Sequence, residues 1–281
     1  MISFKPSLII LAALVFTSCS TTQNINIEEN STAQATLWVQ NSAEYKAIAI
    51  QTYSTASRML SLPLEDSYWT ASLNQEESDG YRSLPPAIIL DIDETILDNS
   101  PFQARMIKQD KTFNIDDWNA WCNEGKADGI PGAVDFTNYA AEKNIAIFYI
   151  SNRGFEVEEA TRRNLIEEGF PVSDTQDNIM TNGEEPGWNS SKIKRRQIIE
   201  ENYRVLMIFG DDLNDFLPAK DISQEERDSI VERYSEYFGR RWFMLPNLVY
   251  GSWDQALFDF ESDLSEEERT KILNKRLDTK N

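Results

Sequence analysis

Hydrophobic side chains in the first part of the chain recur at the spacing of a helix. From Ser31 to about Ser61 they fall three or four residues apart, at Tyr45, Ile48, Ala49, Tyr53, Ala56 and Leu60. This period places them on one face of a helix. Asn41 and Ser42 interrupt the pattern and would divide the helix into two pieces. We expect this segment to pack on the core of the domain.

Three short apolar runs follow, separated by amphipathic stretches of helical length. The runs cover residues 86–90, 145–151 and 205–210 and are typical of strands buried on both faces of a parallel sheet. The amphipathic stretches cover 131–143, 156–168, which Gly169 closes, and 191–201, where Ser191 could cap the helix. Strands that alternate with helices of this length indicate βαβ units. We therefore predict an α/β fold, a Rossmann-like parallel sheet with helices on both faces.

A longer segment, from Asn99 to Gly129, lies between the first strand and the first crossover helix. Loops of this length without structure of their own are uncommon in compact domains. We expect the segment to form an inserted, mostly helical cap. Trp118 and Trp121 lie three residues apart within it, a spacing most typical of a packing stripe on one helix face.

Carboxylates follow two of the predicted strands at the points where the strands end. Asp91 and Asp93 come directly after the first run, and Asp211, Asp212 and Asp215 come after the third. An acidic residue after a strand often only turns the chain or caps the next helix. In a parallel sheet, however, the carboxyl ends of the strands share one edge, and ligands bind there. Carboxylates gathered at that edge would repel one another and raise each other's pKa unless a divalent cation lay between them.

Composition narrows the classes of function. The 281 residues are 41% hydrophobic and 11% aromatic, enough to bury the core of one domain with an insertion or of two small domains. The formal net charge of −20 argues against a nucleic-acid partner or an anionic membrane surface, since both require a basic patch. The chain contains no histidine, which excludes Ser-His-Asp and Cys-His catalysis and a His-ligated zinc. Oxygen ligands remain, and they suit Mg²⁺.

The first residues indicate a targeting segment. Lys5 precedes an apolar run from Leu8 to Phe16, which has the length of a signal-peptide core and is too short for a membrane-spanning helix. The small residues before Cys19 resemble a bacterial lipobox, in which the cysteine becomes the lipidated first residue. We expect a signal peptide over 1–18, a polar tether over 19–30 and the domain over 31–281. A plain secretory signal is the alternative. Cys122 is the only other cysteine, so we expect no intramolecular disulfide.

The spaced motifs of this chain resemble those of the haloacid dehalogenase (HAD) superfamily of phosphatases. All four are present in the order of that superfamily: Asp91-x-Asp93-x-Thr95, Ser151, Lys192 and Gly210-Asp211-x-x-x-Asp215. The stretches DIDETILDNSPF, DDWNAWC, ISNRG, GDDLNDF and LPNLVYGSW further resemble the class C acid phosphatases, bacterial outer-membrane lipoproteins that dephosphorylate nucleoside monophosphates. The similarity runs from about Leu37 to Trp253. Asp212, Asn214 and the pair Gly154-Phe155 depart from the family pattern, which bears on substrate range rather than on chemistry.

The resemblance implies roles for the aspartates. Asp91 would be the nucleophile, and Asp93 would be the acid and base. Mg²⁺ would be held by Asp91, Asp211 and the main-chain carbonyl of Asp93. Asp215 would bind the metal through water or orient the other ligands.

The resemblance also implies a substrate site. Ser151, the Asn152 amide and Lys192 would bind the phosphoryl oxygens, and Trp118 and Tyr250 match positions that sandwich a nucleobase. Each of these residues alone could serve structure only, as a strand end, a turn, a solvated cation or a core aromatic. Their occurrence together, in the family's order, favours the functional interpretation.

The implied activity is that of a Mg²⁺-dependent phosphomonoesterase, an acid phosphatase or 5′-nucleotidase, that hydrolyses nucleoside monophosphates through an aspartyl-phosphate. A phosphatase for another small phosphomonoester, such as a nicotinamide nucleotide or a sugar phosphate, is one alternative. A solute-binding lipoprotein without activity is another. The expected partners are the substrate and a membrane that holds the lipid anchor, and the expected location is the bacterial cell envelope, at the outer membrane. The oligomeric state, a homodimer included, and the role of Arg153 remain open.

Overall fold

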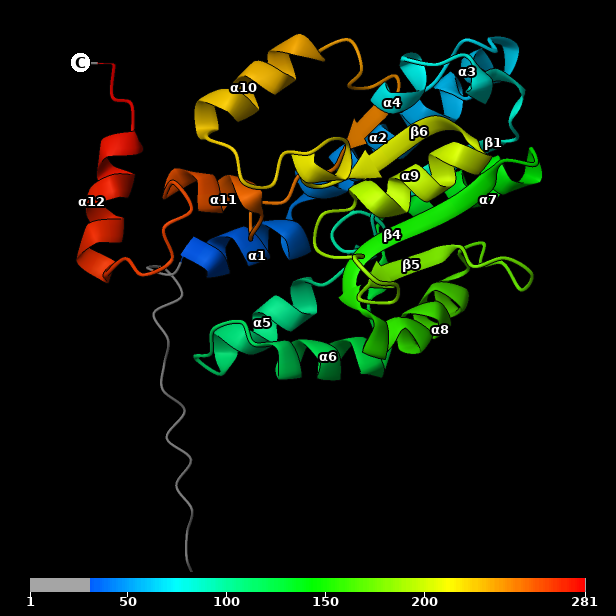
Figure 1. Ribbon diagram of the computed structural model, residues 1–281. Helices are drawn as coiled ribbons and strands as arrows, with labels where there is room; N and C mark the ends of the chain where they lie inside the picture. The colour runs from blue at the N-terminus through cyan, green and yellow to red at the C-terminus, as the bar shows by residue number, and fades with distance from the viewer. Residues whose placement is uncertain (1–30, 281) are drawn as a thin grey trace, which may run out of the picture.

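The computed structural model describes residues 31–280. The predicted signal peptide, the predicted lipidation site Cys19 and the predicted tether lie outside the described residues. Five parallel strands form the central sheet, in the order β5-β4-β1-β6-β7 (Figure 1). Their bounds are β1 Pro86–Leu90, β4 Ala146–Gly154, β5 Ile179–Asn182, β6 Arg204–Gly210 and β7 Trp242–Met244.

β1 lies at the centre of the sheet and is buried on both faces. Ile88 and Leu90 belong to the hydrophobic cluster on one face, and Ala87 and Ile89 belong to the cluster on the other. Successive side chains of a strand point to opposite faces, so a strand covered on both sides carries no polar alternation. The first acidic side chain, Asp91, comes only where β1 ends.

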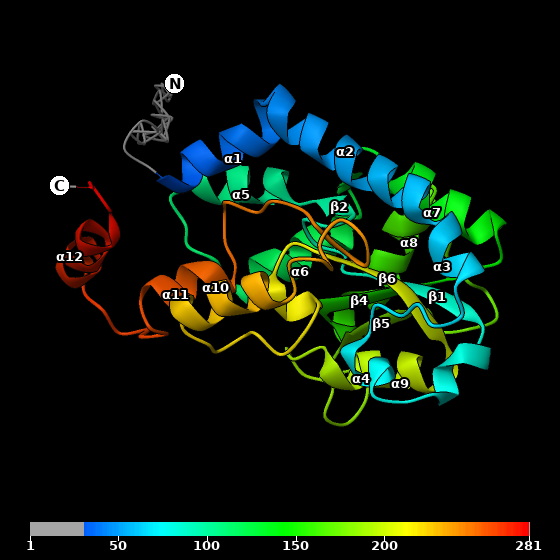
Figure 2. The same ribbon diagram turned by 90° about the horizontal axis from the view of Figure 1, so that it is seen from above.

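Helices cover both faces of the sheet, and Figure 2 shows α2 and α9 on opposite sides of it. α2 (Ala43–Met59), α7 (Ala133–Glu142) and α8 (Glu158–Glu168) contribute to the cluster that contains Ile88. α9 (Ile193–Asn202) and α10 (Gln224–Arg233) contribute to the cluster that contains Ile89. The predicted Rossmann-like α/β fold is confirmed. Within the described part of the chain, the remaining helices are α1 Ser31–Asn41, α3 Ser61–Glu65, α4 Leu73–Glu76, α11 Ser252–Leu257 and α12 Glu266–Arg276, besides α5 and α6 of the insertion. There are also 3₁₀ turns at Gly80–Ser83, Phe155–Val157 and Leu213–Asp215.

The N-terminal helical segment is divided as expected. α1 ends at Asn41, and Ser42 caps α2 by accepting a hydrogen bond from the Tyr45 amide (3.0 Å). Tyr45, Ala49, Tyr53 and Ala56 form the buried face of α2. Ile48, which we expected on that face, is 38% exposed. It lies one residue from Ala49 and is therefore turned by about 100° from the buried stripe.

One predicted helix start is wrong. α9 begins at Ile193 with Lys192 in the N-cap position, and Ser191 does not cap it. The Ser191 amide instead donates to Asn189 Oδ1 (2.9 Å) in a turn that precedes the helix. The predicted end of α8 is confirmed, because Gly169 closes it in the left-handed conformation (φ 89°).

The segment over residues 99–129 carries two helices, α5 (Ser100–Lys108) and α6 (Ile115–Glu124). Its ends meet in an antiparallel pair of short strands, β2 (Leu97–Asp98) and β3 (Asp128–Gly129). α5 contacts α1, and α6 contacts α8 (Figures 1 and 2). Within residues 31–280, no helix has the length and apolar character needed to span a bilayer.

Candidate active site

The ends of β1 and β6 bring aspartates to one edge of the sheet. Asp91 follows β1 directly, and its amide donates to the Phe209 carbonyl of β6 (3.0 Å). Asp211 follows β6, and Asp215 ends the turn Leu213–Asp215. One carboxylate oxygen from each of Asp91, Asp211 and Asp215 lies within 4.8 Å of the other two. Residues far apart in the sequence thus form one group of acidic oxygens.

Gly210 allows this close approach. A Cβ atom at position 210 would overlap the Asp215 side chain. The turn also fixes Asp215, because its Oδ2 accepts from the Asp212 amide (3.1 Å) while Asp212 Oδ1 accepts from the Asn214 amide (2.9 Å). This reciprocal capping leaves the other oxygen of Asp215 to face Lys192.

The loop after β1 orients Asp91. Ile92 is fully buried, and its carbonyl accepts hydrogen bonds from the amides of Ile96 and Leu97 (both 2.9 Å). Thr95, within this loop, donates from Oγ1 to Asp91 Oδ2 (3.1 Å). The threonine of the first motif therefore holds one oxygen of the aspartate that begins it.

Lys192 lies between two of the aspartates. Its Nζ donates to Asp91 Oδ1 and to Asp215 Oδ1, the latter at 2.6 Å. All three side chains are buried. Burial alone would lower the pKa of Lys192, but the Asp215 and Asp91 carboxylates raise it above its ordinary value. Lys192 is therefore a fixed positive charge beside Asp91.

The three grouped aspartates carry more negative charge than Lys192 can balance. Burial raises the pKa of Asp91 to about 7, with Lys192 opposing the rise and Asp215 adding to it. Burial, followed by Asp91 and Asp215, raises the pKa of Asp211 well above its ordinary range. A divalent cation would offset this repulsion, and carboxylate oxygens are the ligands that Mg²⁺ prefers. The donor set therefore fits the predicted metal.

Asp93 turns its carboxylate toward other partners. Its Oδ1 accepts from Arg153 Nε and Asn99 Nδ2 (both 2.9 Å), and its Oδ2 accepts from Ser151 Oγ (3.1 Å). The Asp93 side chain lies outside the group of acidic oxygens described above. The metal contact predicted for Asp93 is left to its main-chain carbonyl.

Two of the three predicted phosphate-binding residues line the cavity over the aspartates, and the third does not. Lys192 and Asn152 line the cavity over the aspartates, and Asn152 Oδ1 accepts from Arg195 Nη2 (2.9 Å). Ser151 is fully buried, and its hydroxyl donates to Asp93. We expected Ser151 to end its strand, and this is wrong. β4 continues to Gly154, which still pairs with Asn182 of β5. A phosphate contact from Ser151 stays a prediction.

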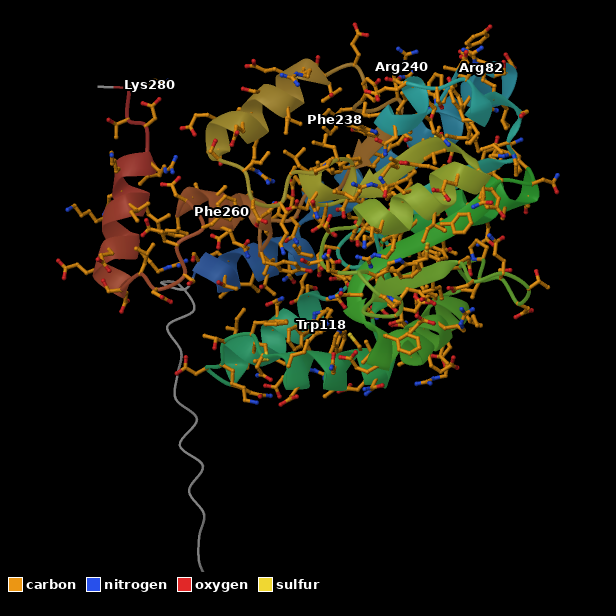
Figure 3. All side chains as sticks on the ribbon, in the orientation of Figure 1. Arg82, Trp118, Phe238, Arg240, Phe260 and Lys280 are labelled. Atoms are coloured by element: carbon orange, nitrogen blue, oxygen red, sulfur yellow. The ribbon has the colours of Figure 1, made fainter. Side chains whose placement is uncertain are left out.

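A cavity of about 600 Å³ opens over the aspartates. Its apolar wall consists of Phe113, Trp118, Val249 and Tyr250. Trp118 comes from α6 of the insertion (Figure 3) and packs edge-on against Phe102, with ring centroids 5.1 Å apart. The two predicted base-binding aromatics, Trp118 and Tyr250, therefore face one cavity. Trp121, three residues from Trp118, is buried in the core.

Further polar contacts complete the site, and the sequence did not indicate them. Asn247 Nδ2 donates to Asp211 Oδ2 (2.8 Å), and the Tyr250 hydroxyl donates to Glu94. Glu94 is buried and lies in the left-handed backbone region (φ 58°). Tyr250 and Glu94 are 156 positions apart, a separation that no local motif can signal.

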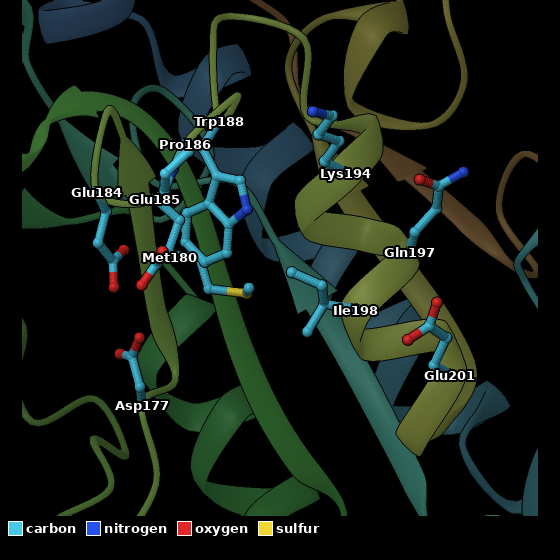
Figure 4. Close-up of a pocket in the computed structure, with 10 residues that line it drawn as sticks. All are labelled: Asp177, Met180, Glu184, Glu185, Pro186, Trp188, Lys194, Gln197, Ile198 and Glu201. Atoms are coloured by element: carbon cyan, nitrogen blue, oxygen red, sulfur yellow. The ribbon is translucent and has the colours of Figure 1, made fainter.

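A second cavity, of about 730 Å³, lies beside α9 and shares no lining residue with the first (Figure 4). Trp188 and Met180 lie on one side of it, and Ile198 of α9 lies on the other. Carboxylates surround it, namely Asp177, Glu184, Glu185 and Glu201. It contains none of the predicted motif residues, so we assign it no part in the chemistry.

Comparison with known proteins points to one family. The chain matches the model of the HAD superfamily, subfamily IIIB (acid phosphatase), over residues 6–253. A class C acid phosphatase from Bacillus anthracis is 33% identical in sequence, and its structure matches with a TM-score of 0.75 over 88% of this chain and 97% of that chain. A crystal structure of a class C acid phosphatase from Bacillus anthracis with tungstate bound matches with a TM-score of 0.76.

Two plant proteins are more distant relatives. The stem 28 kDa glycoprotein of Glycine max is 25% identical over 133 residues, and acid phosphatase 1 of Solanum lycopersicum is 24% identical over 132 residues. Each match covers 46% of this chain, and it covers 52% of the first relative and 51% of the second. The chain thus spans about half the length of these plant proteins. Because the family model covers most of the sequence, the chain belongs to subfamily IIIB of the HAD superfamily, the acid phosphatases.

Proposed function

We propose that the protein is a Mg²⁺-dependent phosphomonoesterase that hydrolyses nucleoside monophosphates through an aspartyl-phosphate on Asp91. One observation carries the proposal. Asp91 is held by Thr95 and Lys192 within the group of acidic oxygens, and Asp93 lies two residues away with its carboxylate outside that group. Two neighbouring carboxylates thus have separate surroundings, which suits a nucleophile and an acid or base.

The reaction proceeds in two displacements. In the first, an oxygen of Asp91 forms a bond to phosphorus while the ester P–O bond breaks, and Asp93 gives a proton to the departing oxygen. In the second, Asp93 takes a proton from a water molecule that attacks phosphorus. The bond between Asp91 and phosphorus then breaks, which releases inorganic phosphate and restores both carboxyl groups.

Asp91, Asp211, Asp215 and the main-chain carbonyl of Asp93 would hold Mg²⁺. The ion supplies positive charge that offsets the repulsion between the Asp91 carboxylate and the phosphate dianion. Lys192 and Asn152 face the cavity and would bind phosphoryl oxygens. The tungstate bound by the phosphatase from Bacillus anthracis is a tetrahedral oxyanion like phosphate, and this supports an oxyanion site in a related fold.

Trp118 and Tyr250 would bind the nucleobase. Both line the cavity, and they come from segments far apart in the sequence, the insertion and the chain after β7. Stacking on aromatic rings accepts any base, because every base has a π face. This supports nucleoside monophosphates as the substrate class ahead of sugar phosphates, which offer no such face.

We also propose that lipidation of Cys19 anchors the protein in the cell envelope, at the outer membrane. The motif before Cys19 supports this, and incorporation of a labelled fatty acid that is lost in Cys19→Ala would test it.

The function is tested with a panel of phosphomonoesters assayed in Mg²⁺ and again after EDTA. We expect phosphate release from nucleoside monophosphates that EDTA abolishes and Mg²⁺ restores. Asp91→Asn should have no measurable turnover and an unchanged circular dichroism spectrum, because the amide has almost the same shape but cannot attack phosphorus. Turnover close to that of the unmodified protein in Asp91→Asn would refute the nucleophile assignment.

A further inference from the structure

Arg153, which the sequence left without a role, is a fully buried residue near the end of β4 (1% exposed). Its Nε and Nη2 atoms both contact Asp93 Oδ1, at 2.9 and 2.8 Å. Nη1 donates to Thr161 Oγ1 of α8 (3.1 Å), and Nη2 also donates to Asn99 Oδ1 (3.3 Å). Each of the three guanidinium nitrogens therefore has a partner.

The contacts divide the two oxygens of Asp93 into different environments. Oδ1 accepts from the Arg153 fork and from Asn99, whereas among residues 31–280 Oδ2 accepts from the Ser151 hydroxyl alone. The Arg153 fork and Asn99 occupy the acceptor positions of Oδ1 and fix that oxygen in place. Oδ2 is the oxygen that keeps an acceptor position for the leaving group.

The same guanidinium joins Asp93 to the helical insertion. Asn99, which accepts from Arg153, also accepts from the indole nitrogen of Trp121 (2.8 Å). On the cavity side, the Trp118 ring lies over the guanidinium, 5.6 Å from its centroid to the Arg153 carbon. Arg153 thus lies between the carboxylate of Asp93 and the aromatic residues of α6.

We propose that Arg153 is a positioning residue that fixes the Asp93 carboxyl group by its Oδ1 and so presents Oδ2 to the leaving-group oxygen. The inference rests on the acid and base role proposed for Asp93. In the first displacement, the proton passes from Asp93 Oδ2 to the departing oxygen as the ester bond breaks. In the second, Oδ2 takes a proton from the attacking water. The contacts of Arg153 with Asn99 and Trp118 fix the position of the insertion relative to Oδ2. They thereby position the leaving group beside that oxygen.

Two substitutions at Arg153 test this. Arg153→Lys keeps the charge but loses the two-nitrogen fork, and Arg153→Met removes the charge but keeps an unbranched, flexible side chain. We measure kcat/KM, which covers the steps up to formation of the aspartyl-phosphate, for an alkyl phosphate and for p-nitrophenyl phosphate. The alkoxide must be protonated as it leaves, whereas p-nitrophenolate leaves unaided. We expect losses of about 10²-fold on the alkyl phosphate and only slight losses on the aryl phosphate.

Equal losses on the two substrates would overturn the proposal, because a distorted site impairs both. Arg204→Lys is the matched control. Arg204 is a buried arginine at the start of β6, away from the catalytic edge, and donates to the main-chain carbonyl of Asp66 (2.6 Å). We expect that variant to keep the ratio of the two rates.

Asp93→Asn separates failure of this inference from failure of the proposed function. If Asp93→Asn shows no difference between the substrates, the acid role of Asp93 fails. If Asp93→Asn shows the difference and Arg153→Lys does not, only the role of Arg153 fails. The double variant should lose no more than Asp93→Asn alone, because both changes act through one carboxyl group. Should Arg153→Met not fold, Thr161→Val removes the Nη1 partner, together with the hydrogen bond from Thr161 to the Val157 carbonyl (3.0 Å), and leaves the contacts of Arg153 with Asp93 in place. It must show the same substrate preference with a smaller difference.

Discussion

At residue 210 the lack of a side chain decides where Asp215 can lie. A methyl group there would occupy the space of the Asp215 side chain, and that carboxylate contacts both Lys192 and the turn that follows β6. Overpacking of such a site costs about 1–3 kcal/mol and is relieved by moving the obstructed group. The glycine of the fourth motif is therefore a steric requirement for grouping Asp215 with Asp91 and Asp211.

We expect Gly210→Ala to displace Asp215 and to raise the Mg²⁺ concentration needed for half-maximal activity by roughly 10-fold, the equivalent of about 1.4 kcal/mol. A Mg²⁺ titration of phosphate release measures this. Gly80→Ala is the control, since a Cβ atom at Gly80 would meet no atom within 4 Å. An unchanged Mg²⁺ response in Gly210→Ala would show that Asp215 takes no part in holding the metal.

Burial of the Cys122 side chain changes the pKa of its thiol. Burial in the core raises the pKa of its thiol to about 12, although Arg153 opposes the rise. The folded state therefore holds the thiol proton more tightly than the unfolded state does. The resulting stability is fully present below the unfolded pKa and is lost as the pH rises toward about 12.

Because the thiolate is the reactive form, we expect Cys122 to resist an aromatic disulfide reagent at pH 8. The measurement uses Cys19→Ala, in which Cys122 is the only cysteine. The thiol should react slowly in the folded protein and at once in concentrated urea. Rapid reaction in both conditions would contradict its burial.

At the scale of elements, the segment after β7 ties one wall of the cavity to the sheet edge that carries the grouped aspartates. This segment, residues 245–251, we call the strap. The Leu245 amide donates to the Gly210 carbonyl (2.9 Å), Asn247 contacts Asp211, and Tyr250 contacts Glu94. The position of the Tyr250 ring therefore depends on a contact made by its hydroxyl.

We expect Tyr250→Phe, which keeps the ring, to raise KM for nucleoside monophosphates by roughly 10-fold with little change in kcat. The reason is that the ring loses the hydrogen bond that holds it, and such a bond contributes about 0.5–1.5 kcal/mol. Trp118→Ala should lower kcat/KM for the same substrates by about 5- to 150-fold through lost stacking. Neither substitution should change kcat or KM for a compact aliphatic phosphate. A loss of kcat on both substrates would mean that the strap supports the metal site instead.

Sequence patterns predicted the elements that carry strong periodic signals and missed the others. The apolar runs of β1, β4 and β6 were long enough to recognise, but β5 has four residues and β7 has three. Such short edge strands are fixed by their neighbours rather than by their own pattern. α10 and α12 were also missed, although each begins with a Ser-x-x-Glu capping box that the sequence displays.

The candidate site, like the fold, was predicted only in part from the sequence. The grouping of Asp91 with Asp211 and Asp215 followed from strand ends that meet at one edge, a rule that needs only the order of the elements. The environment of Asp93 did not follow. It depends on Arg153, 60 positions away, and on the packing of an insertion whose contacts no motif encodes. Local motifs indicate candidate reacting groups, and tertiary packing decides how each is held.

At the scale of the whole molecule, the charge of the surface and the charge of the site act differently on an anionic substrate. The chain carries a formal charge of −20, which repels a phosphate dianion from a distance. Within the site, Lys192 is paired with Asp91 and Asp215, and Arg153 is paired with Asp93. Approach to the protein and chemistry inside it therefore depend on different charges.

Because these ion pairs are buried, a change in ionic strength should affect the approach of the substrate and leave the chemistry within the site unchanged. Salt screens charges that interact through solvent, over a Debye length of about 10 Å at 0.1 M, but barely affects buried pairs. With free Mg²⁺ held constant, we expect added KCl to raise kcat/KM for nucleoside monophosphates several-fold and to leave kcat unchanged. A fall in kcat would mean that solvent reaches the pairs. If kcat/KM rises with added KCl, assays in dilute buffer underestimate the kcat/KM of this enzyme. The enzyme would then act more efficiently on dilute substrate in saline surroundings.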